Sequence, residues 1–358
     1  MDWGWKRSFR LEHDTRAVLG LDIGLTSVKA VRLRKEGSDY AVVSCGLAEI
    51  SRNGHGRTSQ REQLVAISRA IRECLDVAGA RAKYAVCGVS GPDVVVRDFE
   101  FPAIPAEEID SAVRLEASQV CPFNMDDSTV DYQLIEGGGE KIRGILVAAT
   151  NALIRSKVYL TKEASLHCAV MDVDGLALLN CFTQIEGVPE GGSVAILNVG
   201  GSYTTLAIMN AEGWPFIRDM IYVGDDMLKK IASARRMPPK AVRKVLSGAE
   251  PADAEFVKSL EDASTKLVAD VTETLRYYNS QKRFSRIERI HVCGGFALAG
   301  GFIEILDKQL PVETVLWNPF EKIRCDMPGG HRGLLQKNIL QKSGPALAVA
   351  AGLAMRSI

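Results

Sequence analysis

The sequence predicts an α/β protein of two similar halves with a nucleotide cleft between them. Three segments predict this fold, because in each an apolar strand runs into a glycine turn. The first two also share the order strand, glycine, hydroxyl side chains, strand, about half a chain apart. Such a recurrence indicates a duplicated unit, and the space between two units is a common place for a ligand. The segments are 18–29 (VLGLDIGLTSVK), 196–206 (ILNVGGSYTTL) and 290–298 (IHVCGGFAL).

The first turn combines groups that bind phosphate with a group that binds a metal ion. Around Gly24, backbone N–H groups and the hydroxyls of Thr26 and Ser27 can donate to phosphate oxygens. Lys29 brings a positive charge toward the terminal phosphates. Asp22, at the end of the strand, can hold Mg²⁺ through a water molecule and is a candidate catalytic residue.

The other two turns offer the remaining contacts of a nucleotide. The second turn would face the first across the phosphates, and the bare backbone of the third lets an adenine ring approach. Two facing turns of this kind are how the superfamily of actin, Hsp70 and the sugar kinases clamps a nucleotide. The sequence therefore predicts an actin-like, ribonuclease-H-like duplicated fold that binds ATP and Mg²⁺. The expected contacts are Gly200, Gly201 and Ser202 to the phosphates, and Gly294, Gly295 and Phe296 to the adenosine.

Composition is that of an ordinary globular protein. The 358 residues suffice for two cores, with 46% hydrophobic and 25% charged residues. Lys+Arg and Asp+Glu both number 44, which argues against a general nucleic-acid binder. No apolar run approaches the roughly 18 residues of a membrane span, and the charged start predicts no signal peptide. The eight cysteines have no CxxC spacing, so we expect a reducing, cytoplasmic location without zinc or disulfides.

The first half is expected over 17–190, after a flexible surface segment at 1–16. Leu64, Ile67, Ile71 and Leu75 lie at helical spacing, and alternating or continuous apolar runs predict the strands. Prolines at 102 and 105 end a strand before a helix that begins with acidic residues. The expected strands are 27–34, 39–50, 84–89, 94–101, 129–135, 142–150 and 168–173, and the expected helices are 63–78, 106–120, 151–163 and 175–182.

The second half is expected over 191–358, after a Pro/Gly hinge at 189–192. It repeats the strand-turn-strand opening and includes a small subdomain at about 236–284, with a polar excursion at 237–251. A terminal alanine-rich helix from Pro345 is expected to close this half. The expected strands are 194–199, 204–209, 216–223 and 289–293, and the other expected helices are 225–234, 260–278 and 301–310.

Several further motifs resemble the PilM family of actin-like proteins of type IV pilus assembly, which is itself similar to the division protein FtsA. They are FPAIP with the acidic helix and CPF at 101–123, DYQLI at 131–135, RDM at 218–220 with Gly224, CGGFA at 293–297 and PALAVAAGLAMRS at 345–357. The resemblance covers about 17–358. It implies a subdomain inserted in the first half, at about 84–167.

The resemblance also implies a function. Such a protein would be an ATP-binding cytoplasmic scaffold, peripheral at the inner membrane, that holds the cytoplasmic N-terminal tail of a PilN-type membrane protein. Motor ATPases, the platform protein and a second copy of the chain are further possible partners. The inserted subdomain is where we expect the tail, because its helix carries a broad apolar set followed by a Pro-Phe turn. This set is Ile109, Val113, Leu115, Val120 and Phe123.

Two residues bear on whether ATP is hydrolysed. Asn198 stands in the second turn where these ATPases commonly place an aspartate, and an amide supplies no negative charge to a metal-bound water. Asp174 begins a predicted helix where the superfamily often keeps Glu or Gln. It is equally consistent with a helix N-cap and with a group that positions the attacking water. We expect hydrolysis to be weak or absent.

Two alternative functions remain open from the sequence. A sugar or acetate kinase would need a substrate base, usually a carboxylate after the second phosphate turn, and 203–205 (YTT) offers none. An FtsA-like filament former usually carries a C-terminal amphipathic membrane helix, which the sequence up to Ile358 does not show. Both observations favour the scaffold. The first sixteen residues mix Trp3, Trp5 and Phe9 with basic residues, so a membrane contact there is a further hypothesis.

Overall fold

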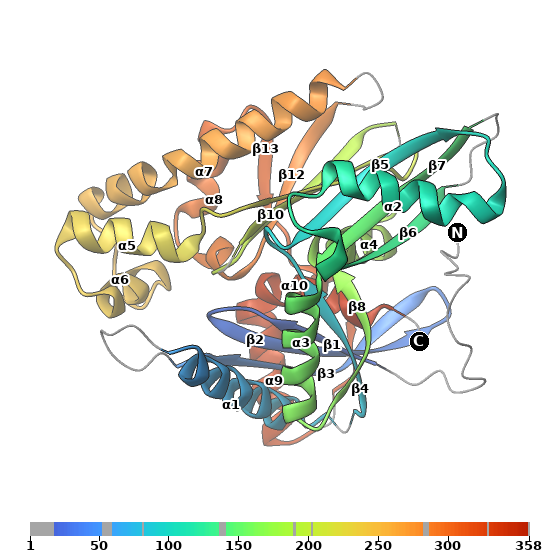
Figure 1. Cartoon of the computed structure of the whole chain (residues 1–358). Helices are drawn as coiled ribbons and strands as arrows, with labels where there is room; N and C mark the ends of the chain where they lie inside the picture. The colour runs from blue at the N-terminus through green and yellow to red at the C-terminus, as the bar shows by residue number, and fades with distance from the viewer. Residues whose placement is uncertain are drawn as a thin grey trace.

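Two large sheets form the frame of the protein, and five strands follow the same order in each, with β14 added to the first sheet. The computed structural model describes residues 18–51, 59–80, 82–135, 141–188, 191–201, 203–281, 286–327 and 329–356. The first sheet has the order β14-β3-β2-β1-β4-β8 and the second has β11-β10-β9-β12-β13 (Figure 1). The segment 1–16 and Ser202 lie outside the described residues. The strands are β1 Leu19–Ile23, β2 Ser27–Glu36, β3 Asp39–Glu49, β4 Tyr84–Val89, β8 His167–Val173, β9 Ser193–Val199, β10 Thr204–Asn210, β11 Pro215–Met220, β12 Ile287–Cys293, β13 Glu313–Leu316 and β14 Arg324–Cys325.

The directions of the strands repeat as well as their order. In each sheet the first three strands of the half form an antiparallel meander. Two further strands follow on the other side of the first strand, and both run parallel to it. The predicted duplicated α/β fold is thus confirmed. In both sheets the tight turn that joins the first two strands lies at the strand ends that face the other half.

Helices cover both faces of the second sheet, which explains its continuous apolar strands. Every residue of β10 is buried. The outer face packs against α5 Gly224–Arg235, α7 Ala254–Ser280 and α8 Phe302–Gln309, through one large apolar cluster that includes Leu197, Leu267 and Phe302. On the first sheet, α1 Gln60–Ala78 and α3 Asn151–Glu163 cover one face. A capping box between Ser59 and Glu62 fixes the start of α1.

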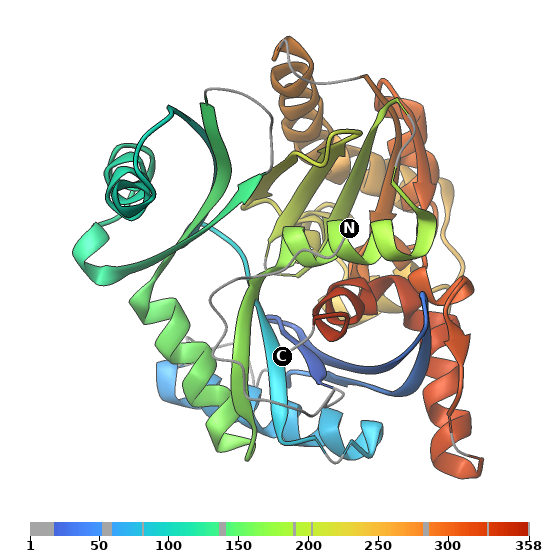
Figure 2. The same ribbon diagram turned by 90° about the vertical axis from the view of Figure 1, so that its right-hand side faces the viewer.

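Two helices cross between the sheets. Helix α4 (Asp174–Glu186) packs on β10 and β11 of the second sheet, and α10 (Ala348–Ala354) packs on β1 and β2 of the first (Figure 2). Small residues allow the close approach, because a Cβ on Gly352 would stand 2.0 Å from the carbonyl oxygen of Ala177. A Cβ on Gly20 would likewise stand 2.1 Å from the carbonyl oxygen of Ala350.

The C-terminal region corrects one expectation. The terminal helix was expected to close the second half, but β14 pairs with β3 and α10 lies on the first sheet. Helix α9 (His331–Ser343) also belongs there, since Gln336 donates to the carbonyls of Val77 and Ala78 at the end of α1, both at 2.9 Å. The chain therefore returns to the first half, because its glycine- and alanine-rich helix fits the narrow gap beside α4.

A separate three-stranded sheet forms the insertion. It has the order β5-β7-β6, with β5 Val94–Pro102, β6 Ser128–Ile135 and β7 Lys141–Thr150, and α2 (Ile109–Val120) covers one face. Strands β4 and β8 pair within the six-stranded sheet, so this unit, 94–150, is narrower than the expected 84–167. We call it the insert.

Some elements differ from the expectations for definable reasons. The excursion at 237–251 contains α6 (Pro239–Leu246), which begins at a proline and buries Val242, Val245 and Leu246. Helix α9 was not predicted, because it buries only Gly333, Gln336 and Leu340 and shows little apolar periodicity. Strand β13 and the two-residue β14 are too short to give an alternating pattern. None of the helices formed by the described residues is apolar over a length sufficient to cross a membrane.

Candidate nucleotide site

A cavity of about 300 Å³ lies where the three glycine turns meet between the halves. Its charged lining consists of three aspartates and two lysines, and its remaining walls come from α1, α3 and the turns. The lining residues that the sequence predicted are Asp22, Gly24, Thr26, Lys29, Asp174, Asn198, Gly200, Gly201, Gly294 and Gly295. Two other predicted residues, Ser27 and Phe296, lie outside the lining.

In the first turn, Lys29 and Asp22 form an ion pair. The β1–β2 register sets the two residues directly opposite each other, and Nζ of Lys29 lies 3.0 Å from Oδ2 of Asp22. The side chains are only 13% and 14% exposed, so the pair is held in a defined geometry. The turn itself is closed by a hydrogen bond from the Gly24 N–H to the carbonyl of Ser27. Lys29 thus orients Asp22 as well as adding positive charge.

The second turn touches the first. A Cβ on Gly201 would stand 2.5 Å from both Oγ1 and Cγ2 of Thr26, so only glycine permits this contact. The Gly200 N–H donates to the carbonyl of Tyr203, which closes the turn. The hydroxyl of Thr26 from the first half and the backbone of Gly201 from the second half therefore meet at one edge of the cavity.

Asp174 is a partly desolvated carboxyl group at the start of α4. Burial, followed by the negative charge of Asp22, raises the pKa of Asp174 to about 7, although Lys157 and a hydrogen bond from Ser90 act in the opposite direction. Oδ2 accepts that bond from Ser90 Oγ at 2.7 Å, and Oδ1 is buried and has no hydrogen-bond partner among the described residues. Asp174 makes no N-cap bond in its helix, whose N-cap is Val173. Asp174 therefore lines the cavity with one carboxyl oxygen held by Ser90 and the other buried beside Gly88.

The third turn is shaped by Asn198 and Gly294. Gly294 has φ of +94°, and a Cβ there would stand 2.5 Å from Oδ1 of Asn198. The Gly294 N–H donates to the carbonyl of Pro345. Phe296 turns away from the cavity and packs edge-to-face on Phe302, with ring centroids 5.0 Å apart.

Sequence reasoning missed several residues at or beside the cavity. Ser90 and Asp93 follow β4, and their place after a predicted parallel strand was a usable signal. Lys157 comes from α3 and donates to the carbonyl of Ile23 at 2.7 Å, a contact with no signal in the sequence. Asp219 was also missed: the β10–β11 register sets it opposite Thr205, so a carboxylate does accompany the second turn.

The charges of the cavity fit a nucleotide that arrives with a divalent cation. Asp22 and Asp93 balance Lys29 and Lys157, and Asp174, whose pKa is raised to about 7, adds at most a partial negative charge near neutral pH, so the cavity offers a bare triphosphate no net positive charge. Within the described part of the chain, no three His, Cys, Asp or Glu side chains are grouped as a metal site. Phosphate oxygens would therefore have to supply most ligands of a Mg²⁺ ion held near Asp22.

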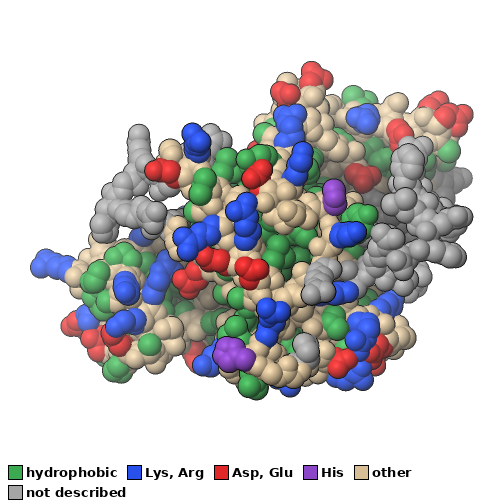
Figure 3. Space-filling view, turned by 90° about the horizontal axis from the view of Figure 1, so that it is seen from below, with side chains coloured by type: hydrophobic (Ala, Val, Ile, Leu, Met, Phe, Trp, Pro, Cys, Tyr) green, Lys and Arg blue, Asp and Glu red, His purple; other side chains and the backbone are tan. Residues whose placement is uncertain are grey.

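The surface gives no sign of a strongly basic face in the view from below, where Lys and Arg mix with Asp, Glu and hydrophobic side chains (Figure 3). This mixture agrees with the equal numbers of acidic and basic residues, 44 of each.

Comparison with solved structures places the fold among actin-like proteins. A PilM-PilN type IV pilus biogenesis complex is 23% identical over 96% of this chain and 99% of that chain, with a TM-score of 0.80. The ethanolamine utilization protein EutJ from Carboxydothermus hydrogenoformans is 13% identical over 94% and 89%, with a TM-score of 0.54. A glycerol dehydratase reactivase is 11% identical over 94% and 98%, with a TM-score of 0.50.

A family model confirms the resemblance seen in the sequence motifs. The model described as type IV pilus assembly protein PilM matches residues 20–358, which is nearly the whole chain. The actin-like frame, the insert and the paired glycine turns agree with that match. The chain therefore belongs to the PilM family of type IV pilus assembly proteins.

Proposed function

We propose that the cavity between the halves binds ATP together with Mg²⁺. The observation that supports this most is the contact of Gly201 with Thr26, which brings two phosphate-type turns to one edge of a cavity that holds both lysines and carboxylates. The size of the cavity, about 300 Å³, is at the lower end of the range for ligand sites.

Several residues of the cavity have distinct roles in this proposal. The hydroxyl of Thr26 and backbone N–H groups of the first two turns, other than those of Gly24 and Gly200, which close the turns, would bind phosphate oxygens. Lys29 and Lys157 would offset their charge, and Asp22 would hold the hydrated metal ion, which neutralises the phosphates. Asp174 would accept a hydrogen bond from a water molecule near the terminal phosphate.

The charge balance suggests the test. Calorimetric titration with ATP should give binding in the presence of Mg²⁺ and a large loss of affinity in EDTA, because the two lysines only balance the aspartates and the metal ion is needed to neutralise the phosphates. Equal affinity under both conditions, or no binding under either, would overturn the proposal. ADP and AMP titrations report how much of the affinity depends on the terminal phosphates.

We also propose that the insert binds the cytoplasmic tail of a PilN-type inner-membrane protein, with the chain as a peripheral scaffold. In α2, a single stripe of Ile109, Val113 and Ala117 is buried against Phe99 and Leu146 of the insert sheet. Leu115 is 63% exposed on the same helix, so it is not needed for that core. An aliphatic side chain on this surface is suited to an apolar anchor of a short peptide.

A kinase is less well supported. Asp219, the carboxylate beside the second turn, already accepts hydrogen bonds on both oxygens, from Thr205 and from the Gly91 N–H. A substrate base needs at least one oxygen directed at the substrate hydroxyl. Asp219 is therefore better suited to holding two segments together than to proton abstraction.

A further inference from the structure

The loop between β4 and β5 joins the first half to the insert, and it is held by carboxylates from both halves. Ser90 donates to Asp174 of α4 at 2.7 Å, and the backbone N–H of Gly91 donates to Oδ2 of Asp219 at 2.6 Å. Asp219 lies on β11, an edge strand of the second sheet. One loop of four residues thus contacts the cavity, the second half and the insert.

Asp219 is fixed from the side of the nucleotide cavity. Thr205 lines the cavity, and its hydroxyl donates to Oδ1 of Asp219 at 2.6 Å. Thr205 is 1% exposed, so the hydroxyl has one defined position. Burial raises the pKa of Asp219, and the two hydrogen bonds act against that rise. The carboxylate therefore bridges the strand after the second phosphate turn and the loop that leads into the insert.

A second contact runs in parallel with this bridge. Gly91 has φ of +99°, and a Cβ there would stand 2.5 Å from the ring of Tyr203, the residue that closes the second turn. Gly91 thus lies directly against the aromatic ring that the second turn carries on Tyr203. Tyr203 and Asp219 therefore both contact Gly91, and both come from the second half.

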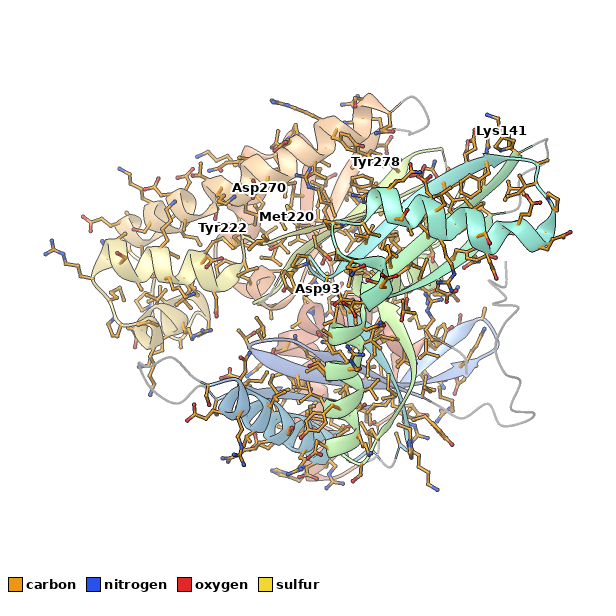
Figure 4. All side chains as sticks on the ribbon, in the orientation of Figure 1. Asp93, Lys141, Met220, Tyr222, Asp270 and Tyr278 are labelled. Carbon is orange, nitrogen blue, oxygen red and sulfur yellow. The ribbon has the colours of Figure 1, made fainter. Side chains whose placement is uncertain are left out.

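The loop is equally well anchored to the insert. The Val94 N–H, at the start of β5, donates to the carbonyl of Gly91 at 3.0 Å, and the Thr150 N–H donates to the carbonyl of Asp93 at 3.0 Å. Thr150 ends β7 and caps α3. Figure 4 shows Asp93 at the foot of the insert, below Met220 at the end of β11. Strands β5 and β11 also pack against each other.

We propose that Asp219 is a positioning residue that couples the nucleotide cavity to the insert, so that binding of Mg²⁺–ATP and binding of the partner's tail change each other's affinity. This inference rests on the proposed function, because it needs both ligands. Linkage requires the effect to be reciprocal, and such couplings are typically on the order of 5–150-fold. The bridge is a contiguous hydrogen-bonded path between the two sites, which is one way in which coupling is carried.

The test is a calorimetric cycle with a synthetic peptide of the cytoplasmic N-terminal tail of a PilN-type protein from the same organism. Peptide affinity is measured on the full chain with and without saturating Mg²⁺–ATP, and Mg²⁺–ATP affinity with and without peptide. In the wild type, both ratios should be equal and differ from one by about fivefold or more. Asp219→Ala should bring both ratios to one.

Conservative and distant variants distinguish the bridge from a loss of stability. Asp219→Asn can still accept from Gly91 and donate to Thr205, so most of the coupling should persist. Glu313→Ala removes an acid from the opposite edge strand, where Glu313 pairs with Arg289 of its own sheet, and should leave the coupling intact. Thermal unfolding of each variant shows whether it is folded at the titration temperature.

The outcomes separate this inference from the proposed function. If either ligand does not bind the wild type, the proposed function is wrong. If both bind and Asp219→Ala keeps the wild-type ratio, or Asp219→Asn loses as much as Asp219→Ala, the bridge is wrong and the proposed function stands. Hydrogen exchange gives an independent readout: Mg²⁺–ATP should slow exchange over 94–102 and 141–150 in the wild type and not in Asp219→Ala.

Discussion

Gly201 lies against Thr26 with no space for a side chain between them, since a Cβ would stand 2.5 Å from two atoms of Thr26. The two residues belong to different halves, so their contact fixes how closely the glycine turns approach. Gly201→Ala should therefore separate the turns and weaken Mg²⁺–ATP binding. A tenfold increase in the Kd for Mg²⁺–ATP corresponds to a loss of about 1.4 kcal/mol of binding free energy.

The clash can be relieved from the other side. Thr26→Ala removes Oγ1 and Cγ2 and leaves only a Cβ, 3.1 Å from the point that a Cβ on Gly201 would occupy. In calorimetry, Gly201→Ala should cost less in the Thr26→Ala background than in the wild type, so the double variant should lose less binding free energy than the sum of the two single variants. Strict additivity of the two variants would show that the turns do not limit each other.

Lys29→Ala should weaken Mg²⁺–ATP binding and also destabilise the protein. The substitution removes a cation and leaves the mostly buried Asp22 without its partner at 3.0 Å. Leaving a buried polar group unpaired costs about 1–3 kcal/mol. Lys35→Ala, on the exposed end of the same strand, is the matched control and should change neither quantity. Wild-type ATP affinity in Lys29→Ala would rule out the assigned role.

Asp174 should make stability depend on pH. Its pKa of about 7 lies above the usual 3.8, so the native state binds a proton that the unfolded state lacks between these values. The contribution of Asp174 to the unfolding free energy should therefore be fully present below about pH 4 and be lost as the pH rises toward 7. The loss is at most about 4 kcal/mol. Asp219, whose pKa is also raised, adds to the fall in the same direction.

Asp174→Asn removes this titration while keeping the shape of the side chain. Urea unfolding at pH 5 and pH 8 should show a smaller decrease for the variant than for the wild type, and higher stability of the variant at pH 8. Identical decreases in the two proteins would mean that Asp174 is ionised in the native state at both pH values.

The parts of the site that follow a strand in the sequence were predictable, because an apolar run that ends in glycine and hydroxyl residues specifies a turn locally. Asp22, Thr26, Gly201 and Gly294 could be assigned in this way, and the structure brings them to one cavity. Lys157 and Asp219 could not, since their positions depend on how α3 and β11 pack against distant segments.

The same distinction holds for the fold. The duplication of the fold could be anticipated from the repeated openings of the two halves. The return of the C-terminal chain to the first sheet could not be anticipated. It depends on the close approach of distant carbonyl groups to Gly20 and Gly352, which the sequence does not indicate. Helix α9 likewise depends on Gln336 reaching the end of α1, a contact that leaves no periodic pattern.

Asn198 should keep ATP hydrolysis slow. The residue lines the cavity but carries no charge, and its Oδ1 lies against Gly294. Asn198→Asp would place a carboxylate beside the proposed Mg²⁺ site and should raise the rate of phosphate release, by up to about 10²-fold. Turnover of tens per second by the wild type, or no change in Asn198→Asp, would contradict this role. ATP affinity measured alongside separates a change in binding from a change in rate.

Leu115 on α2 should contribute to binding of the partner's tail. It is 63% exposed and outside the buried stripe of its helix, so Leu115→Asp should leave the insert folded. Burying an aliphatic side chain contributes about 1.5–3 kcal/mol, so its replacement by a charge should weaken peptide binding by about tenfold or more. Phe123→Ala, in the turn that follows α2, tests the neighbouring part of the same surface.

The chain offers a matched control for this prediction. Leu334 on α9 is 64% exposed and belongs to the first half, away from the insert. Leu334→Asp therefore introduces the same charge at the same exposure and should leave the tail affinity unchanged. If Leu115→Asp and Phe123→Ala are folded, bind Mg²⁺–ATP normally and keep full affinity for the tail peptide, the tail binds another face. A loss of affinity in Leu334→Asp but not in Leu115→Asp would identify that face as the one formed by α9.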